Sequence, residues 1–162
     1  NNVPAVGRLG PNGKLAVVVG VGENPDMPDW NLQLFTHEKP EKEKRGRVVA
    51  LDAETGLMLW SHDLPLWHGW AAGDWAVPEH VCLPISSASP VLAGDGTAYV
   101  GFQDGRLYAI KDKDGNGLIE GTEVSSFDAG NAFQGSPGIA PGMLVASPCN
   151  GLHVFRSKAQ AQ

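Results

Sequence analysis

Residues 89–110 read SPVLAGDGTAYVGFQDGRLYAI, and residues 136–155 read SPGIAPGMLVASPCNGLHVF. Both stretches open with Ser-Pro and continue as three short apolar runs that are separated by turns containing glycine. The two copies begin 47 residues apart, which is the length of one four-stranded blade of a β-propeller. The repeat therefore predicts an all-β fold made of four-stranded antiparallel sheets.

An earlier copy of the repeat is interrupted by an insertion. Its opening half lies in residues 3–20, and its closing half reads GRVVALDAETGLMLW at residues 46–60. Between them, residues 21–45 carry three prolines and the mixed-charge run EKPEKEKR, which predicts a solvated loop. We therefore expect about two and a half blades in residues 1–156. The predicted divisions are blade one at 3–65, with its inserted loop at 21–45, an insertion at 66–84, blade two at 86–130, a partial blade at 134–156, and a tail at 157–162.

The connection between the third and fourth strands differs between the copies. In blade one it is the short turn DAETG at residues 52–56, whereas in blade two it is DKDGNGLIEGTE at residues 112–123. The longer connection fits the calcium-loop pattern D-x-[DN]-x-[DN]-G-x5-E at every fixed position. Alternate residues of such a loop point at a common centre, where a calcium ion takes oxygen ligands. The loop therefore predicts a calcium site.

Each predicted ligand has a defined role in this pattern. The predicted ligands are the side chains of Asp112, Asp114 and Asn116, the backbone carbonyl of Leu118, Glu120 directly or through a water, and both carboxylate oxygens of Glu123. The runs at 105–110 and 124–127 read as strands and not as the helices of an EF-hand. A stabilising ion is thus favoured over a sensor switch. The alternative is a polar hairpin turn that binds no ion.

Composition and charge limit the classes of partner. The chain has 162 residues and a net charge of -6, and no basic patch alternates with aromatic residues, so nucleic acid and anionic membranes are poor partners. No apolar run is long enough to predict a membrane span. The two cysteines, Cys82 and Cys149, could form one disulfide in an oxidising compartment or remain two buried thiols.

The insertion at residues 66–84 is the other place where chemistry could reside. It holds three of the five tryptophans, and His68, Asp74, Glu79 and His80 could form a ligand pocket or a transition-metal site. Their irregular spacing favours instead an aromatic-rich connection over one propeller face, with its polar groups in water.

The stretch GRVVALDAETGLMLW at residues 46–60 resembles the repeat of the pyrroloquinoline-quinone-like (PQQ-like) β-propellers, whose blades read G-x-V/L-x-A-L-D-x-x-T-G-x-x-x-W. DGRLYAI at residues 104–110 repeats its first half, and NGLHVF at residues 150–155 does so more weakly. The tryptophan of the repeat is present only at Trp60, and its equivalent in blade two lies near Ser125.

The resemblance implies a fold more specifically than an activity. The family includes quinoprotein alcohol dehydrogenases, the outer-membrane assembly lipoprotein and other extracytoplasmic proteins. We expect a non-catalytic, calcium-stabilised binding or scaffold module outside the cytoplasm, which contacts a protein partner or the remainder of a larger propeller. The alternative is a fragment of a PQQ-dependent alcohol or sugar dehydrogenase. In those enzymes a central calcium and often adjacent cysteines hold the quinone, whereas Cys82 and Cys149 are separated and the predicted calcium loop joins two strands.

Overall fold

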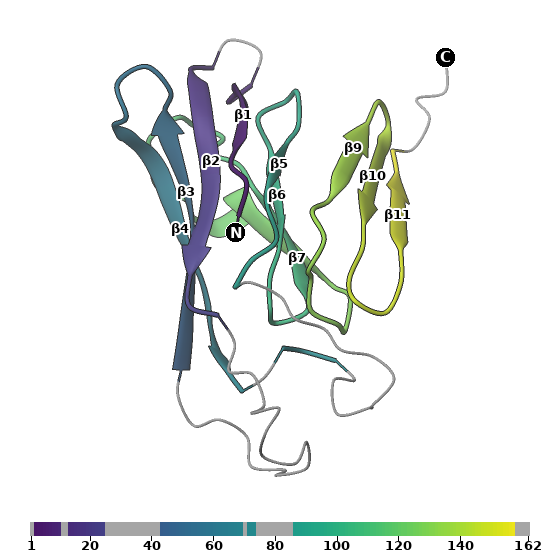
Figure 1. Ribbon diagram of the computed structural model, residues 1–162. Coiled ribbons are helices and arrows are strands. Elements are labelled where there is room, and N and C mark those ends of the chain that lie inside the picture. Colours follow the sequence, from purple (N-terminus) through teal and green to yellow (C-terminus); the bar gives the residue numbers. More distant parts are fainter. Residues whose placement is uncertain (1, 11–12, 25–42, 70, 74–85, 158–162) are drawn as a thin grey trace.

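Three antiparallel sheets stand side by side in the computed structural model (Figure 1). The structure describes residues 2–10, 13–24, 43–69, 71–73 and 86–157. Two of the sheets have four strands and the third has three. In each sheet the strands are neighbours in the order in which the chain forms them, as in the blade of a propeller. The predicted all-β architecture of two complete sheets and one partial sheet is therefore confirmed.

The strand boundaries follow the repeat. The first sheet consists of β1 (Ala5–Arg8), β2 (Leu15–Gly22), β3 (Glu43–Asp52) and β4 (Met58–His68). The second sheet consists of β5 (Val91–Leu92), β6 (Ala98–Gly101), β7 (Arg106–Ile110) and β8 (Val124–Asp128). The third sheet consists of β9 (Gly138–Ala140), β10 (Met143–Ala146) and β11 (His153–Arg156). A 3₁₀ turn, η1 (Gly121–Glu123), leads into β8.

Three strands of the first sheet extend further than the sequence indicates. Residues 21–22, 43–45 and 66–68, which the sequence analysis assigns to insertions, belong to β2, β3 and β4. The charged residues at the start of β3 are compatible with a strand because their exposure alternates, and buried Lys44 lies opposite Trp67 of β4. Residues 23–24, 69 and 71–73 of the insertions are also described, and the rest, including Asp74, Glu79 and His80, lie outside the described residues.

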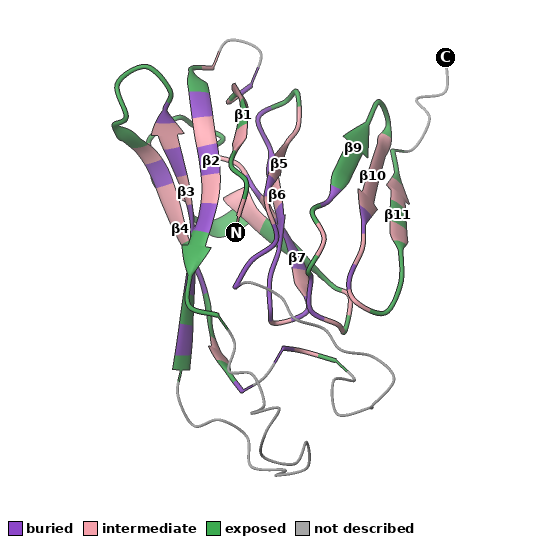
Figure 2. Ribbon diagram, in the orientation of Figure 1, coloured by how far each residue is buried: buried purple, intermediate pink, exposed green. Residues whose placement is uncertain are grey.

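The main hydrophobic core lies between the first and second sheets. Figure 2 shows buried residues alternating with more exposed ones along the long strands of the first sheet. The buried members of this core are Val18, Val48, Ala50, Trp60, Leu64, Ala98, Val100, Phe102, Tyr108 and Ile110. A smaller core between the second and third sheets has the buried members Ala88, Leu107, Phe133 and Ala146.

Two glycines allow neighbouring sheets to approach closely. Gly20 lies opposite Val48 in the first sheet, and Gly101 lies opposite Leu107 at the equivalent place in the second. A Cβ atom at Gly20 would overlap the hydroxyl of Ser87, and one at Gly101 would overlap the ring of Phe133. Only glycine therefore fits at either position without a shift of the following segment.

Cys149 is bonded in a disulfide. The described residues contain no free cysteine, and Cys82, the only other cysteine of the sequence, lies outside them. Of the two alternatives left open by the sequence, the disulfide therefore holds for Cys149.

Candidate calcium site

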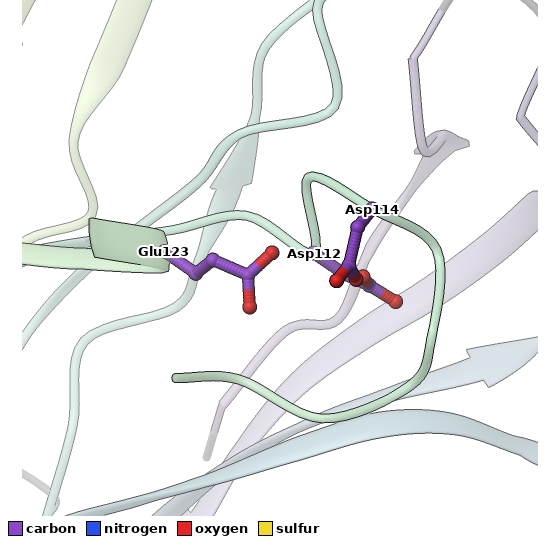
Figure 3. Close-up of side chains that lie close together, drawn as sticks. All are labelled: Asp112, Asp114 and Glu123. Atoms are coloured by element: carbon purple, nitrogen blue, oxygen red, sulfur yellow. The ribbon is translucent and has the colours of Figure 1, made fainter. Parts of the chain in front are cut away.

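Three carboxylates come together in the connection between β7 and β8. One carboxylate oxygen from each of Asp112, Asp114 and Glu123 lies within 4.8 Å of the others. Figure 3 shows the two aspartates on the loop and Glu123 reaching toward them from the far end of the same connection. Strands flank the loop on both sides, as the sequence predicts.

The fold of this loop depends on the first aspartate. Asp112 Oδ1 accepts a hydrogen bond from the backbone N–H of Gly115 at 2.8 Å, and Oδ2 accepts one from Gly117 at 3.0 Å. Gly117 has a φ of 82°, a conformation that costs little without a Cβ atom. Asp112 thereby holds the loop in a tight turn around its own carboxylate.

The next two predicted ligands bond to each other and to the backbone. Asp114 accepts hydrogen bonds from Asn116, one from its backbone N–H at 3.1 Å and one from its side-chain amide at 2.9 Å. Asn116 Oδ1 in turn accepts a hydrogen bond from the backbone N–H of Leu118 at 2.6 Å. Of these two side chains, Asp114 joins the carboxylate group, whereas the oxygen of Asn116 is engaged with the backbone.

The last predicted ligand is fixed by two backbone donors. Glu123 accepts hydrogen bonds from the N–H groups of Lys113 and Glu120. These bonds, the one from Lys113 first, hold the pKa of Glu123 below its ordinary value, because they favour the ionised carboxylate. The exposed Glu120 contributes its backbone to this arrangement, and its carboxylate is not among the three that come together.

The loop also contacts the first sheet, and the sequence does not predict this contact. Leu118 forms an isolated parallel bridge with Ser61 of β4, and a Cβ atom at Gly117 would lie 2.9 Å from the backbone oxygen of Leu59. Ile119 packs against the main core. The apolar pair Leu118-Ile119 within an otherwise polar loop was the available signal for this contact.

The arrangement offers the ligand type that calcium prefers. Carboxylate and carbonyl oxygens bind hard divalent cations, and three converging carboxylates supply most of the negative charge that such a site needs. Of the four residues suggested as a second site, only His68 lies in the described part of the chain, where its Nε2 is 3.3 Å from Glu43 Oε1. The structure therefore supports the β7–β8 loop as the candidate metal site.

Sheets of this topology, packed face to face and built from a repeat of PQQ-like sequence, define a partial β-propeller of the PQQ-like class. Residues 41–157 match the family described as "Outer membrane protein assembly factor BamB", and the chain belongs to that family.

One similar solved structure is BamB from Moraxella catarrhalis, with 18% sequence identity and a TM-score of 0.45. The match covers 76% of this chain and 32% of the Moraxella chain, so this chain spans about a third of that protein. No curated protein matches this chain. Within the described residues, no helix has the length and apolar character needed to cross a lipid bilayer.

Proposed function

We propose that this chain is a non-catalytic, calcium-stabilised scaffold segment of a BamB-like propeller. The observation that carries the proposal is the convergence of Asp112, Asp114 and Glu123 in a loop that also lies against the neighbouring sheet. Calcium bound there would act on stability and on the packing of two sheets. In this role the calcium ion would take no part in a reaction.

Electrostatics explains why an ion would stabilise this loop. Without a cation, the carboxylates of Asp112, Asp114 and Glu123 face one another across less than 4.8 Å, and like charges at such distances repel. A divalent ion replaces this repulsion with attraction. Ile119 and Leu118 hold the middle of the loop on the first sheet. The stabilisation by a bound ion would therefore extend to the packing of the first two sheets.

The proposed setting is outside the cytoplasm, with a protein partner or the remainder of a larger propeller. The disulfide at Cys149 supports an oxidising compartment. Membership of the BamB family is consistent with a role in protein assembly, which we propose here for this chain.

Calorimetric titration with calcium tests the metal site. We expect Glu123→Gln to lower the calcium affinity by at least about tenfold, because it removes a charged ligand from a site built on carboxylates. Glu120→Gln should have a smaller effect, since its carboxylate lies outside the group of three. Glu54→Gln, in the equivalent turn of the first sheet, is the matched control and should change nothing. Equal calcium affinity in the wild type and Glu123→Gln would refute the site.

A further inference from the structure

Two equivalent backbone hydrogen bonds tie the second and third sheets to the segments that lead into them. Before β5, the carbonyl of Ser86 accepts a hydrogen bond from the N–H of Gln103 at 3.1 Å. Before β9, the carbonyl of Ala132 accepts one from the N–H of Cys149 at 2.9 Å. Each bond lies next to an isolated antiparallel bridge, which joins Ser87 to Phe102 in one case and Phe133 to Pro148 in the other. The two bonds are therefore one recurring feature of the repeat.

Residues 71–73 connect these two bonds. The N–H of Ala72 donates to the carbonyl of Gln103 at 2.8 Å, and the carbonyl of Ala72 accepts a hydrogen bond from the N–H of Ala132 at 2.8 Å. An unbroken row of backbone hydrogen bonds thus runs through Ser86, Gln103, Ala72, Ala132 and Cys149. Ala72 belongs to the insertion and not to the repeat, so this segment is an added piece that joins the second sheet to the third.

Two glycines let the added segment lie close to its neighbours. A Cβ atom at Gly105, in the turn between β6 and β7, would lie 3.2 Å from the Cβ of Ala72. A Cβ atom at Gly73 would overlap the side chain of Asn131, in the connection between β8 and β9. Both glycines have a positive φ, 84° and 108° respectively, which a residue with a side chain adopts only at a cost. The backbone around residues 71–73 therefore allows them to fit between the two sheets.

A disulfide lies at the end of the row. Cys149, which donates the last hydrogen bond, is bonded in a disulfide. It also packs against the small cluster formed by the buried residues Ala71 and Ala132. In the described part of the chain, the buried cluster between the second and third sheets has four members, whereas the cluster between the first and second has ten. Apolar packing therefore gives the third sheet less support than it gives the first two.

We propose that residues 71–73 are a clamp between the second and third sheets, and that the disulfide at Cys149 locks this clamp. While the cysteines are thiols, the third sheet opens locally from the second, because backbone hydrogen bonds with little apolar packing around them exchange readily with water. Formation of the disulfide removes two electrons and two protons from two thiols, and a disulfide of an exchange partner takes them up and becomes two thiols. Oxidation thereby fixes the third sheet. The proposal does not depend on calcium.

Hydrogen exchange of the 162-residue chain with and without a phosphine reductant tests the lock, with reduction confirmed by the mass of the alkylated thiols. Reduction should speed exchange at the amide of Ala132 and at β9–β11 at least about tenfold, and should leave β2 and β3 unchanged. Cys149→Ser should show the fast exchange with and without the reductant. Equal exchange of the third sheet in the oxidised and reduced chain would overturn the proposal. So would an equal increase in all three sheets, which would indicate a general loss of stability.

A second variant tests the clamp while the disulfide is intact. Ala72→Pro removes the N–H that donates to Gln103 and should speed exchange at Ala132 and β10 at least about fivefold. Ala53→Pro is the matched control, because it also removes one backbone hydrogen bond, to Leu15 of the first sheet, and should leave the third sheet unchanged. Exchange of the third sheet that is the same in Ala72→Pro and the wild type would refute the clamp. If Ala72→Pro does not fold, the comparison of the oxidised and reduced wild type decides.

Discussion

The two interfaces between neighbouring sheets are built from the same strand pattern and are packed differently. Between the first and second sheets, Trp60 is 2% exposed and belongs to a cluster of ten buried residues. Between the second and third sheets, the cluster of buried apolar residues has four members in the described part of the chain, and open cavities remain. Trp60 lies opposite Ala50, and Ser125 lies opposite Ala109 at the equivalent position. The repeat thus dictates strand pairing, and Trp60 fills at the first interface a position that Ser125 leaves open at the second.

Removal of the central side chain of the first interface should have the largest effect. Trp60→Ala should lower the free energy of unfolding by about 3–5 kcal/mol, because it leaves a large cavity in a close-packed core. Urea denaturation measures the change. Phe155→Ala, at the half-filled second interface, should cost about 1–2 kcal/mol, since its ring is only partly buried. A larger loss for Phe155→Ala than for Trp60→Ala would mean that the contrast between the interfaces is wrong.

Calcium should act on one interface and not on the other. The candidate loop lies against β4 of the first sheet, and the third sheet has no contact with it among the described bridges. At a calcium concentration of about 100 times Kd, the ion should add about 2.7 kcal/mol to stability. Hydrogen exchange with and without chelator should show the difference at β4 and β8 and little change at β11. A thermal transition that chelator leaves unchanged would contradict the stabilising role.

A tryptophan at the equivalent position of the second sheet should make the packing of the second interface more like that of the first. Ser125→Trp should raise the free energy of unfolding by about 1 kcal/mol, because the indole covers apolar surface around Leu107 and Phe155. Thermal unfolding measures the gain, with Leu57→Trp in an exposed turn as the control. A destabilised Ser125→Trp would show that the cavity cannot accept the ring.

The smallest expected effect is that of pH on stability. It arises at the turn of the first sheet that corresponds to the calcium loop. Asp52 accepts hydrogen bonds from the backbone N–H groups of Thr55 and Glu54, and these hold the pKa of Asp52 below its ordinary value. Its contribution to stability is therefore complete above the unfolded pKa of about 3.9 and is lost as the pH falls through the lower folded value.

Melting temperatures of the wild type and Asp52→Asn, measured across this acid range, test the expectation. The difference between the two proteins should shrink as the pH falls. A difference that does not depend on pH would mean that the charge of Asp52 has no part in closing this turn.

Much of the fold could be predicted because its signals are local. The turn residues and apolar runs predicted the strands around the calcium loop, and the spacing of the repeat placed Ser125 where Trp60 stands, which the register confirms. The convergence of Asp112, Asp114 and Glu123 agrees with the motif, and the binding of calcium there stays a prediction. The PQQ-dependent dehydrogenase also stays a prediction, which an absorbance titration with the quinone would test.

Other features depend on contacts between segments that are distant in the sequence, and the sequence indicates these contacts only weakly. The third copy of the repeat aligns by sequence with Phe155 in the place of Ala109, whereas the strand register places it at Ile110. Leu144 lies between Ile139 and Phe155 in the third sheet, as Ala98 lies between Leu92 and Ile110 in the second. A shift of one residue moves a side chain to the opposite face of a sheet, so the sequence alignment directs this ring the wrong way. The contact of Leu118 with Ser61 joins two sheets and could not be read from either copy alone.

The glycines at the second strands of the first two sheets have a consequence for a complete ring. Gly20 and Gly101 each admit a side chain from the segment that leads into the following sheet, and we expect this close approach to influence the separation and rotation between one sheet and the next. In a circular arrangement the rotations must add up to a full turn. A single methyl group at either glycine would change one of these angles, and the error would appear as a gap at the place where the circle closes.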